Sequence, residues 1–151
     1  MANLFSPAFF IINGLCILIL IWGFKRPAQA AYAIGSFFML TAVINIVMLI
    51  GWPEAYFDLS AVAVYEWYIR SINESVSRHL MIVVVSITIG QLLIGLGLFS
   101  TGNWRMAALF CALIFLWAIA PFGAGAAFPA PVILSIACIV IMLKINKKQP
   151  A

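Results

Sequence analysis

The sequence predicts an all-α fold, a polytopic membrane helix bundle of about five spans with one outer amphipathic helix. Of its 151 residues, 66% are hydrophobic and 8% are charged, whereas an ordinary soluble domain carries roughly 25% charged residues. The apolar residues gather in segments long enough to cross a bilayer, and every acidic residue falls between Glu54 and Glu74. We therefore expect a single integral membrane domain over residues 1–151, with the lipid bilayer as its main partner, in a cell membrane of the bacterial inner-membrane type.

The first two spans are predicted at residues 7–24 and 28–50. Pro7 suits the first position of a helix, and Lys25-Arg26-Pro27 closes the first apolar segment. Gly51-Trp52-Pro53 closes the second, because glycine and proline stop a helix and tryptophan is typical of a membrane interface. No basic region precedes the first span, so we expect it to be a retained span and not a signal peptide.

Residues 54–79 are predicted as the outer amphipathic segment, in which a helix capped by Asp58 or Ser60 continues into the third span. Its charged residues recur at every fourth position, which puts them on one stripe of a helix. They are Glu66, Arg70, Glu74 and Arg78. An apolar seam from Val62 to Val76 runs beside the stripe. Two interpretations stay open: a solvated face that holds the helix at the membrane surface, or a face that meets a partner protein or the mouth of an intramembrane cavity.

Two other side chains belong to the same region. Trp67 suits either a protein interface or the headgroup belt of a membrane. His79 is the only histidine, and one imidazole without carboxylate partners cannot build a metal site, so a structural or interfacial role is expected, with proton handling as the alternative. The candidate residues for a partner or a cavity mouth are therefore Glu66, Trp67, Arg70, Glu74, Arg78 and His79.

Three more spans follow the outer helix. A tight Ser100–Asn103 connection makes the third and fourth spans antiparallel neighbours. The apolar stretch after Trp104 is too long for one span, and the Gly- and Pro-rich segment from Pro121 to Pro131 supplies the turn. Because the last two spans are short, a re-entrant hairpin, leaving four full spans, is the alternative. The predicted spans lie at residues 80–99, 105–120 and 131–145.

Charge placement orients the chain, because basic residues that flank spans stay on the cytoplasmic side. With the N-terminus outside and the C-terminus cytoplasmic, the acids share the outer side with Arg70 and Arg78. The cytoplasmic ends then carry basic residues and no acid, namely Lys25, Arg26, Arg105, Lys144, Lys147 and Lys148. A net charge of +4 is too small and too dispersed to indicate nucleic-acid binding.

The polar residues inside the spans are uncharged, which argues against ion-coupled transport because its pathways use buried ionisable groups. The amides are expected to bond across helices, with ligation of a lipid headgroup or a quinone-like carbonyl as the alternative. They are Asn13, Asn45 and Gln91. Small residues four apart predict close helix contacts, at Ala31/Gly35, Ser86/Gly90 and Ala108/Ala112.

No catalytic constellation is visible in the sequence. A glycine-rich phosphate loop, a nucleophile elbow and a paired histidine and acid are all missing. We therefore predict no catalytic residue, no metal site and no resident cofactor, with a quinone as the alternative ligand.

The run from Gly90 to Ala108, GQLLIGLGLFSTGNWRMAA, resembles the DoxX-like family of small bacterial membrane proteins. In that family a Gly-rich apolar helix ends in a Thr/Arg turn, here Thr101 and Arg105, and an Ala-rich helix follows. The resemblance implies a helical membrane protein of about four helices, and some members are linked to quinone-dependent oxidation of sulfur compounds or to redox-stress complexes. This chain differs from the pattern in its polar segment and its apparent fifth span.

Three function classes follow from these observations. The first is a non-enzymatic accessory or assembly subunit whose outer helix meets a membrane-protein partner or a second copy of the chain. The second is a quinone-linked membrane oxidoreductase subunit, and the third is a lipid or small-solute carrier. The first is favoured, because polarity is concentrated in one element and no catalytic residues are visible.

Overall fold

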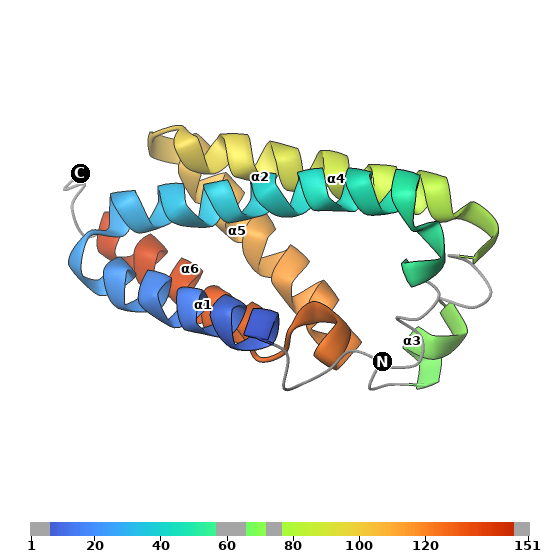
Figure 1. Cartoon of the computed structure of the whole chain (residues 1–151). Coiled ribbons are helices and arrows are strands. Elements are labelled where there is room, and N and C mark those ends of the chain that lie inside the picture. The colour runs from blue at the N-terminus through green and yellow to red at the C-terminus, as the bar shows by residue number, and fades with distance from the viewer. Residues whose placement is uncertain (1–6, 57–65, 72–76, 147–151) are drawn as a thin grey trace.

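A computed structural model of the chain describes residues 7–56, 66–71 and 77–146, and within them it is all-helical, which confirms the predicted fold class. The elements, drawn in Figure 1, are α1 (Pro7–Lys25), α2 (Pro27–Gly51), α3 (Glu66–Ser71), α4 (Ser77–Phe99), α5 (Gly102–Ile119), the 3-10 helix η3 (Ala120–Ala126) and α6 (Ala130–Asn146).

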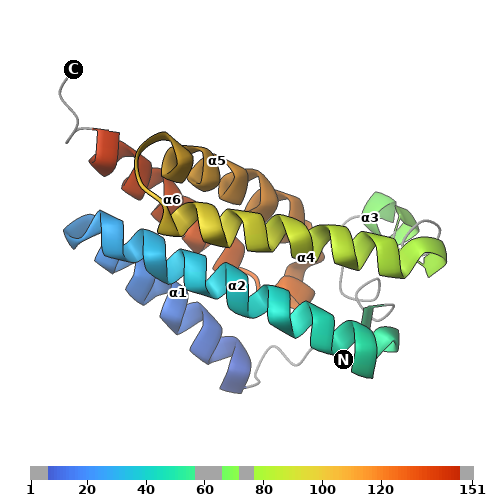
Figure 2. The ribbon, with the colours of Figure 1, turned by 90° about the horizontal axis from the view of Figure 1, so that it is seen from above.

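The helices pack as two layers with one helix between them. α2 lies along α4 and α1 lies along α6, and these are the two most extensive helix contacts. α5 crosses diagonally between the layers and contacts both α4 and α6. Figure 2 shows α2 and α4 side by side from above. The core lies between the layers, where the fully buried side chains include Phe38, Leu98, Leu109, Leu134 and Ile141.

Within the described ranges, four helical stretches are long and apolar enough to cross a membrane: Pro7–Lys25, Pro27–Gly51, Arg78–Phe99 and Gly102–Gly123. The chain is thus a multi-pass membrane protein. Its surface suits lipid, since large apolar side chains such as Ile50 and Trp104 are exposed. α6 has 17 residues, about 26 Å at 1.5 Å per residue, which is short of the ~30 Å hydrocarbon core. A fifth crossing therefore stays a prediction.

α2 and α4 approach each other closely at two glycines. A Cβ atom built on Gly95 would lie 3.1 Å from the Gly35 carbonyl oxygen and 2.7 Å from Met39 Cγ, so only glycine lets the two backbones come this near. The predicted close contact is confirmed at Gly35, which lies against α4, and Ala31 is buried in the core.

The other two predicted pairs of small residues have opposite outcomes. Ala108 and Ala112 are buried in the core, as predicted. The prediction for Ser86 and Gly90 is wrong, since a Cβ on Gly90 would meet nothing within 4 Å. Ser86 is exposed and donates to the Ile82 carbonyl of its own helix at 2.7 Å.

The outer segment over residues 54–79 differs from the prediction of a helix that continues through it into the third span. Residues 53–56 form a 3-10 turn and α3 covers only Glu66–Ser71, while residues 57–65 and 72–76, with the Val62–Val76 seam, lie outside the described residues. The predicted continuity through His79 is wrong, because the helical path of α4 is interrupted there (φ −130°, ψ 30°). Arg78 and His79 are exposed at this interruption.

Candidate functional site

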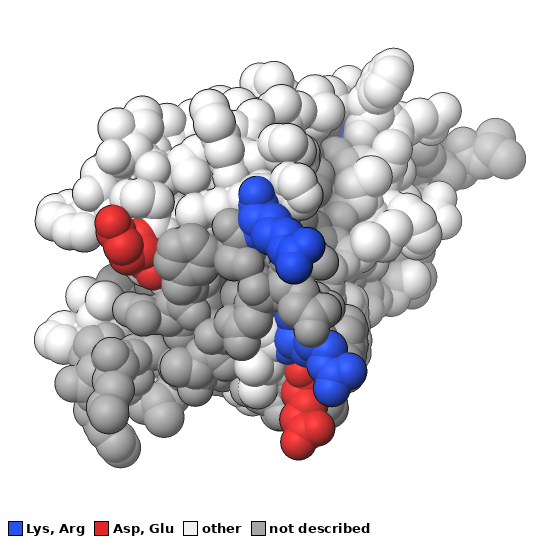
Figure 3. All heavy atoms as spheres, turned by 90° about the vertical axis from the view of Figure 1, so that its right-hand side faces the viewer, with Lys and Arg blue, Asp and Glu red and all other residues white. Residues whose placement is uncertain are grey.

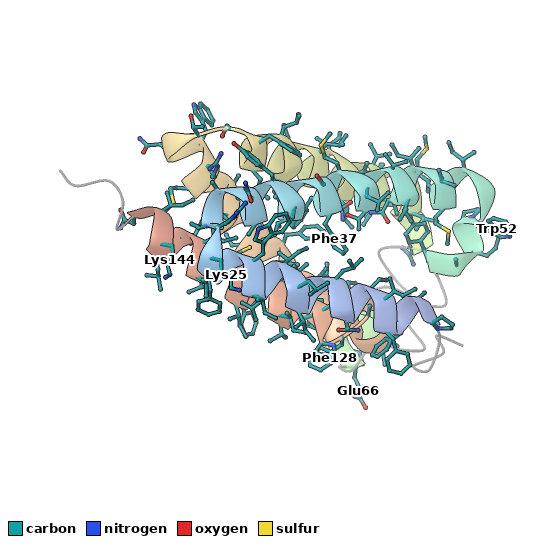
Figure 4. All side chains as sticks on the ribbon, turned by 60° about the vertical axis from the view of Figure 1, so that its left-hand side comes forward. Lys25, Phe37, Trp52, Glu66, Phe128 and Lys144 are labelled. Carbon is teal, nitrogen blue, oxygen red and sulfur yellow. The ribbon has the colours of Figure 1, made fainter. Side chains whose placement is uncertain are left out.

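The end of the bundle that holds the α1–α2 and α4–α5 turns carries only basic charge among the described residues. We call it the basic end, and its cations are Lys25, Arg26, Arg105 and Lys144. Figure 4 shows Lys25 and Lys144 at this end, with Trp52, Glu66 and Phe128 at the opposite one. Because Lys144 lies in the last turn of α6, α6 ends at the basic end.

The α1–α2 turn consists of one residue, Arg26. α1 ends at Lys25 and α2 begins at Pro27, where the missing N–H and fixed φ of proline suit a first helical position. The Arg26 N–H donates to the Trp22 carbonyl at 2.7 Å. Its side-chain Nη1 donates to Gln29 Oε1 at 3.4 Å, so the guanidinium folds over the first turn of α2.

Arg105 is held more firmly, in the first turn of α5. The residue is 6% exposed; its Nε donates to the Ser100 carbonyl at 2.7 Å and its Nη2 to the Tyr32 hydroxyl at 3.0 Å. Its guanidinium carbon lies 4.9 Å from the centroid of the Tyr32 ring, and that ring stacks on Phe99. Tyr32 of α2 and Ser100 of the α4–α5 turn thus fix this cation of α5 by contacts with neutral groups.

These side chains border an open pocket of about 450 Å³, a volume within the usual range of small-molecule sites. Cationic groups from three helix ends face it, together with the first turn of α2 and one apolar residue of α6. Its lining residues are Lys25, Arg26, Pro27, Ala28, Gln29, Arg105 and Ile145.

Two helix N-termini lie at the basic end, beside the C-termini of α1, α4 and α6. The α2 and α5 N-termini both lie there, neither has an acidic residue in its first turn, and neither has a side-chain cap. A helix N-terminus carries about half a positive charge. The described carboxylates, Glu54 and Glu66, belong to the opposite end. The cationic side chains that line the pocket therefore favour an anion there.

The predicted partner residues lie at the opposite end, which we call the outer end. Glu66 and Arg70 are exposed on α3, and Arg78 and His79 are exposed at the start of α4. Glu74 and the side chain of Trp67 lie outside the described residues. Figure 3 shows acidic and basic side chains together on this face. α3 makes no extensive contact with any other described helix.

Two of the three predicted amides meet. Asn45 Nδ2 donates to Gln91 Oε1 at 2.8 Å and so joins α2 to α4. The Tyr56 hydroxyl donates to the Asn45 carbonyl at 3.0 Å and lies 3.3 Å from Asn45 Oδ1, which ties the 3-10 turn to α2. Burial raises the pKa of the Tyr56 hydroxyl and keeps it a donor. Sequence reasoning missed Tyr56.

Asn13 belongs to a separate contact. Its Nδ2 donates to the Phe9 carbonyl at 3.0 Å and to the Ala127 carbonyl at 3.2 Å, so it links α1 to the chain just before α6. Its Oδ1 is buried and accepts no hydrogen bond from the described residues.

Sequence reasoning also treated Arg105 only as a charge beside a span and did not find its burial. The available signal was its place in a first helical turn after a tight connection, where a cation is unfavourable. Across the described ranges, no three His, Cys, Asp or Glu side chains gather as metal ligands.

Comparisons of the chain with known protein families, with curated proteins and with solved structures found no match. The resemblance to DoxX-like proteins accordingly stays a prediction.

Proposed function

We propose that this membrane protein is a non-enzymatic accessory or assembly subunit whose outer end meets a membrane-protein partner. The observation that supports this function is the position of α3. It exposes Glu66 and Arg70 and makes no extensive contact with any other described helix, so its charged side chains are available to a neighbouring protein.

The energetics favour recognition over stability as the role of these charges. An exposed pair one helical turn apart is worth only about 0.3–0.5 kcal/mol, so Glu66 and Arg70 add little to the fold. Complementary charges across an interface select the partner and speed association. The partner we propose is therefore the polar outer surface of another integral membrane protein.

Gentle purification of the tagged chain from its host tests the proposal. We expect the wild type to elute in a mild detergent as a complex larger than a monomer, of defined stoichiometry by mass spectrometry. The double charge reversal Glu66→Lys with Arg70→Glu should release the partner. The control Lys144→Gln changes an exposed charge at the basic end and should leave the complex intact.

A lone wild-type monomer, with Glu66, Arg70, Glu74 and Arg78 all replaceable without effect in the host, would contradict the proposal. A complex of two identical chains would assign the interface to a homo-oligomer. An absorption spectrum and lipid extract of the same preparation test the alternative of an oxidoreductase subunit, since that function requires a stoichiometric quinone.

A further inference from the structure

We infer that the pocket at the basic end binds the phosphate group of an anionic membrane lipid. This inference concerns residues at the end opposite to α3, so it and the proposed accessory function can fail independently.

The first argument is the buried cation. Arg105 is 6% exposed, and its two hydrogen bonds go to neutral oxygens, a backbone carbonyl and a tyrosine hydroxyl. A buried charge is costly unless an opposite charge compensates it. Among the described residues, the structure assigns Nε and Nη2 to these two partners and shows no acceptor for Nη1, while Arg105 lines the pocket. An anion there would complete its coordination.

The second argument is the backbone. The first-turn residues Ala28 and Gln29 of α2 line the same pocket, and no side chain caps their N–H groups. Proline at the preceding position contributes no donor. Uncapped N–H groups at a helix N-terminus bind phosphate well, because they donate hydrogen bonds and lie at the positive end of the helix dipole.

The third argument concerns the source of the phosphate. Lys25 and Arg26 add two cations at the rim, and basic pockets between membrane helices are typical sites for anionic headgroups. Ile145 forms an apolar wall of the pocket. Within one turn along α1 and α6, Phe24 and Leu143 are exposed and offer an apolar path for acyl chains. A free phosphate ion would make no use of these apolar residues.

Native mass spectrometry in an uncharged detergent, with phosphatidylglycerol as the added lipid, tests the inference. We expect one saturable site on the wild type. Arg105→Gln should weaken the affinity about tenfold or more, equivalent to the loss of one charge-assisted contact. Arg26→Gln removes an exposed cation at the rim of the pocket and should also weaken lipid binding. Because Arg26 is exposed, this variant keeps the test valid if Arg105→Gln fails to fold.

Lys144→Gln is the matched control, because it removes one positive charge from the same end without touching the pocket lining. We expect it to change the affinity by less than about threefold. Equal losses for Lys144→Gln and Arg26→Gln would mean unspecific surface attraction and would overturn the inference. It would also be overturned if inorganic phosphate displaced the lipid at equal concentration, since the site would then be one for free phosphate.

Discussion

The two ends of the bundle hold their charges in opposite ways. At the basic end, Arg105 is buried, and Tyr32 of α2 and the Ser100 carbonyl of the α4–α5 turn fix its guanidinium. At the outer end, Glu66 and Arg70 are exposed on a short helix that stands apart from the other described helices. A fixed cation beside a pocket suits a small anion. Exposed charges of both signs suit a larger protein surface that brings its own complementary charges.

The largest effect on stability is expected where α4 packs against α5, close to the basic end. A Cβ on Gly97 would lie 2.6 Å from Ala108 Cβ, whereas a Cβ on Gly90 would meet nothing within 4 Å. Gly97→Ala should therefore destabilise the protein by about 1–3 kcal/mol through overpacking between α4 and α5. Gly90→Ala, in the same helix, should leave stability unchanged or slightly raised. Unfolding of both variants in detergent measures the difference, and equal effects would contradict this close contact.

A matched pair of tyrosine substitutions compares the ends directly. Tyr32→Phe removes the hydroxyl that accepts a hydrogen bond from the charged Arg105 side chain. We expect it to lower the free energy of unfolding by about 1.5 kcal/mol. This is the lower end for hydrogen bonds to charged groups, because Tyr32 is partly exposed. Tyr56→Phe removes a neutral bond to Asn45 and should cost about 1 kcal/mol. The same unfolding assay compares the stability of the two variants. A larger loss of stability for Tyr56→Phe than for Tyr32→Phe would contradict the prediction.

A smaller effect appears as pH dependence at the outer end. The pKa of Tyr56 is raised in the folded protein because burial disfavours the phenolate. Its contribution to stability is therefore fully present below the ordinary tyrosine pKa of about 10 and is lost as the pH rises through the raised value. The stability difference between wild type and Tyr56→Phe should be constant from neutral pH to about pH 9 and should shrink above that. A difference that grows in alkaline solution would contradict this burial.

The smallest effect is expected for the charges of α3. Glu66→Gln and Arg70→Gln should each change stability by less than about 0.5 kcal/mol, because both residues are exposed and surface ion pairs contribute little. Thermal unfolding of the purified monomer tests this. A loss comparable to that of Tyr32→Phe would show that α3 is held by its own bundle, and the contrast between the ends would no longer stand.

Helix boundaries are predicted well from the sequence, because individual proline and glycine residues mark them. The first two spans, predicted at 7–24 and 28–50, end within one residue of α1 and α2, because Pro7, Pro27 and Pro53 mark helix boundaries locally. Gly102 marks the α4–α5 turn in the same way, with a left-handed φ of 61° that favours glycine.

Which face of each helix points inward is much harder to predict. In lipid a helix is apolar all round, so hydrophobic periodicity does not separate its buried side from its exposed side. For this reason Ser86 and Gly90 were assigned to a contact that they do not make. The burial of Arg105 and the bond from Tyr56 to Asn45 depend on the same tertiary information.

The single-residue connection between α1 and α2 has a consequence for biogenesis. With only Arg26 between them, the two helices are constrained to enter the bilayer together as a hairpin, and neither can change its direction alone. Moving Lys25 and Arg26 through the hydrocarbon would cost several kcal/mol per charge, so the turn stays at the surface where it first arrives. α4, α5 and α6 are then synthesised against a hairpin already in place, and one wall of the basic pocket is set before Arg105 has been translated.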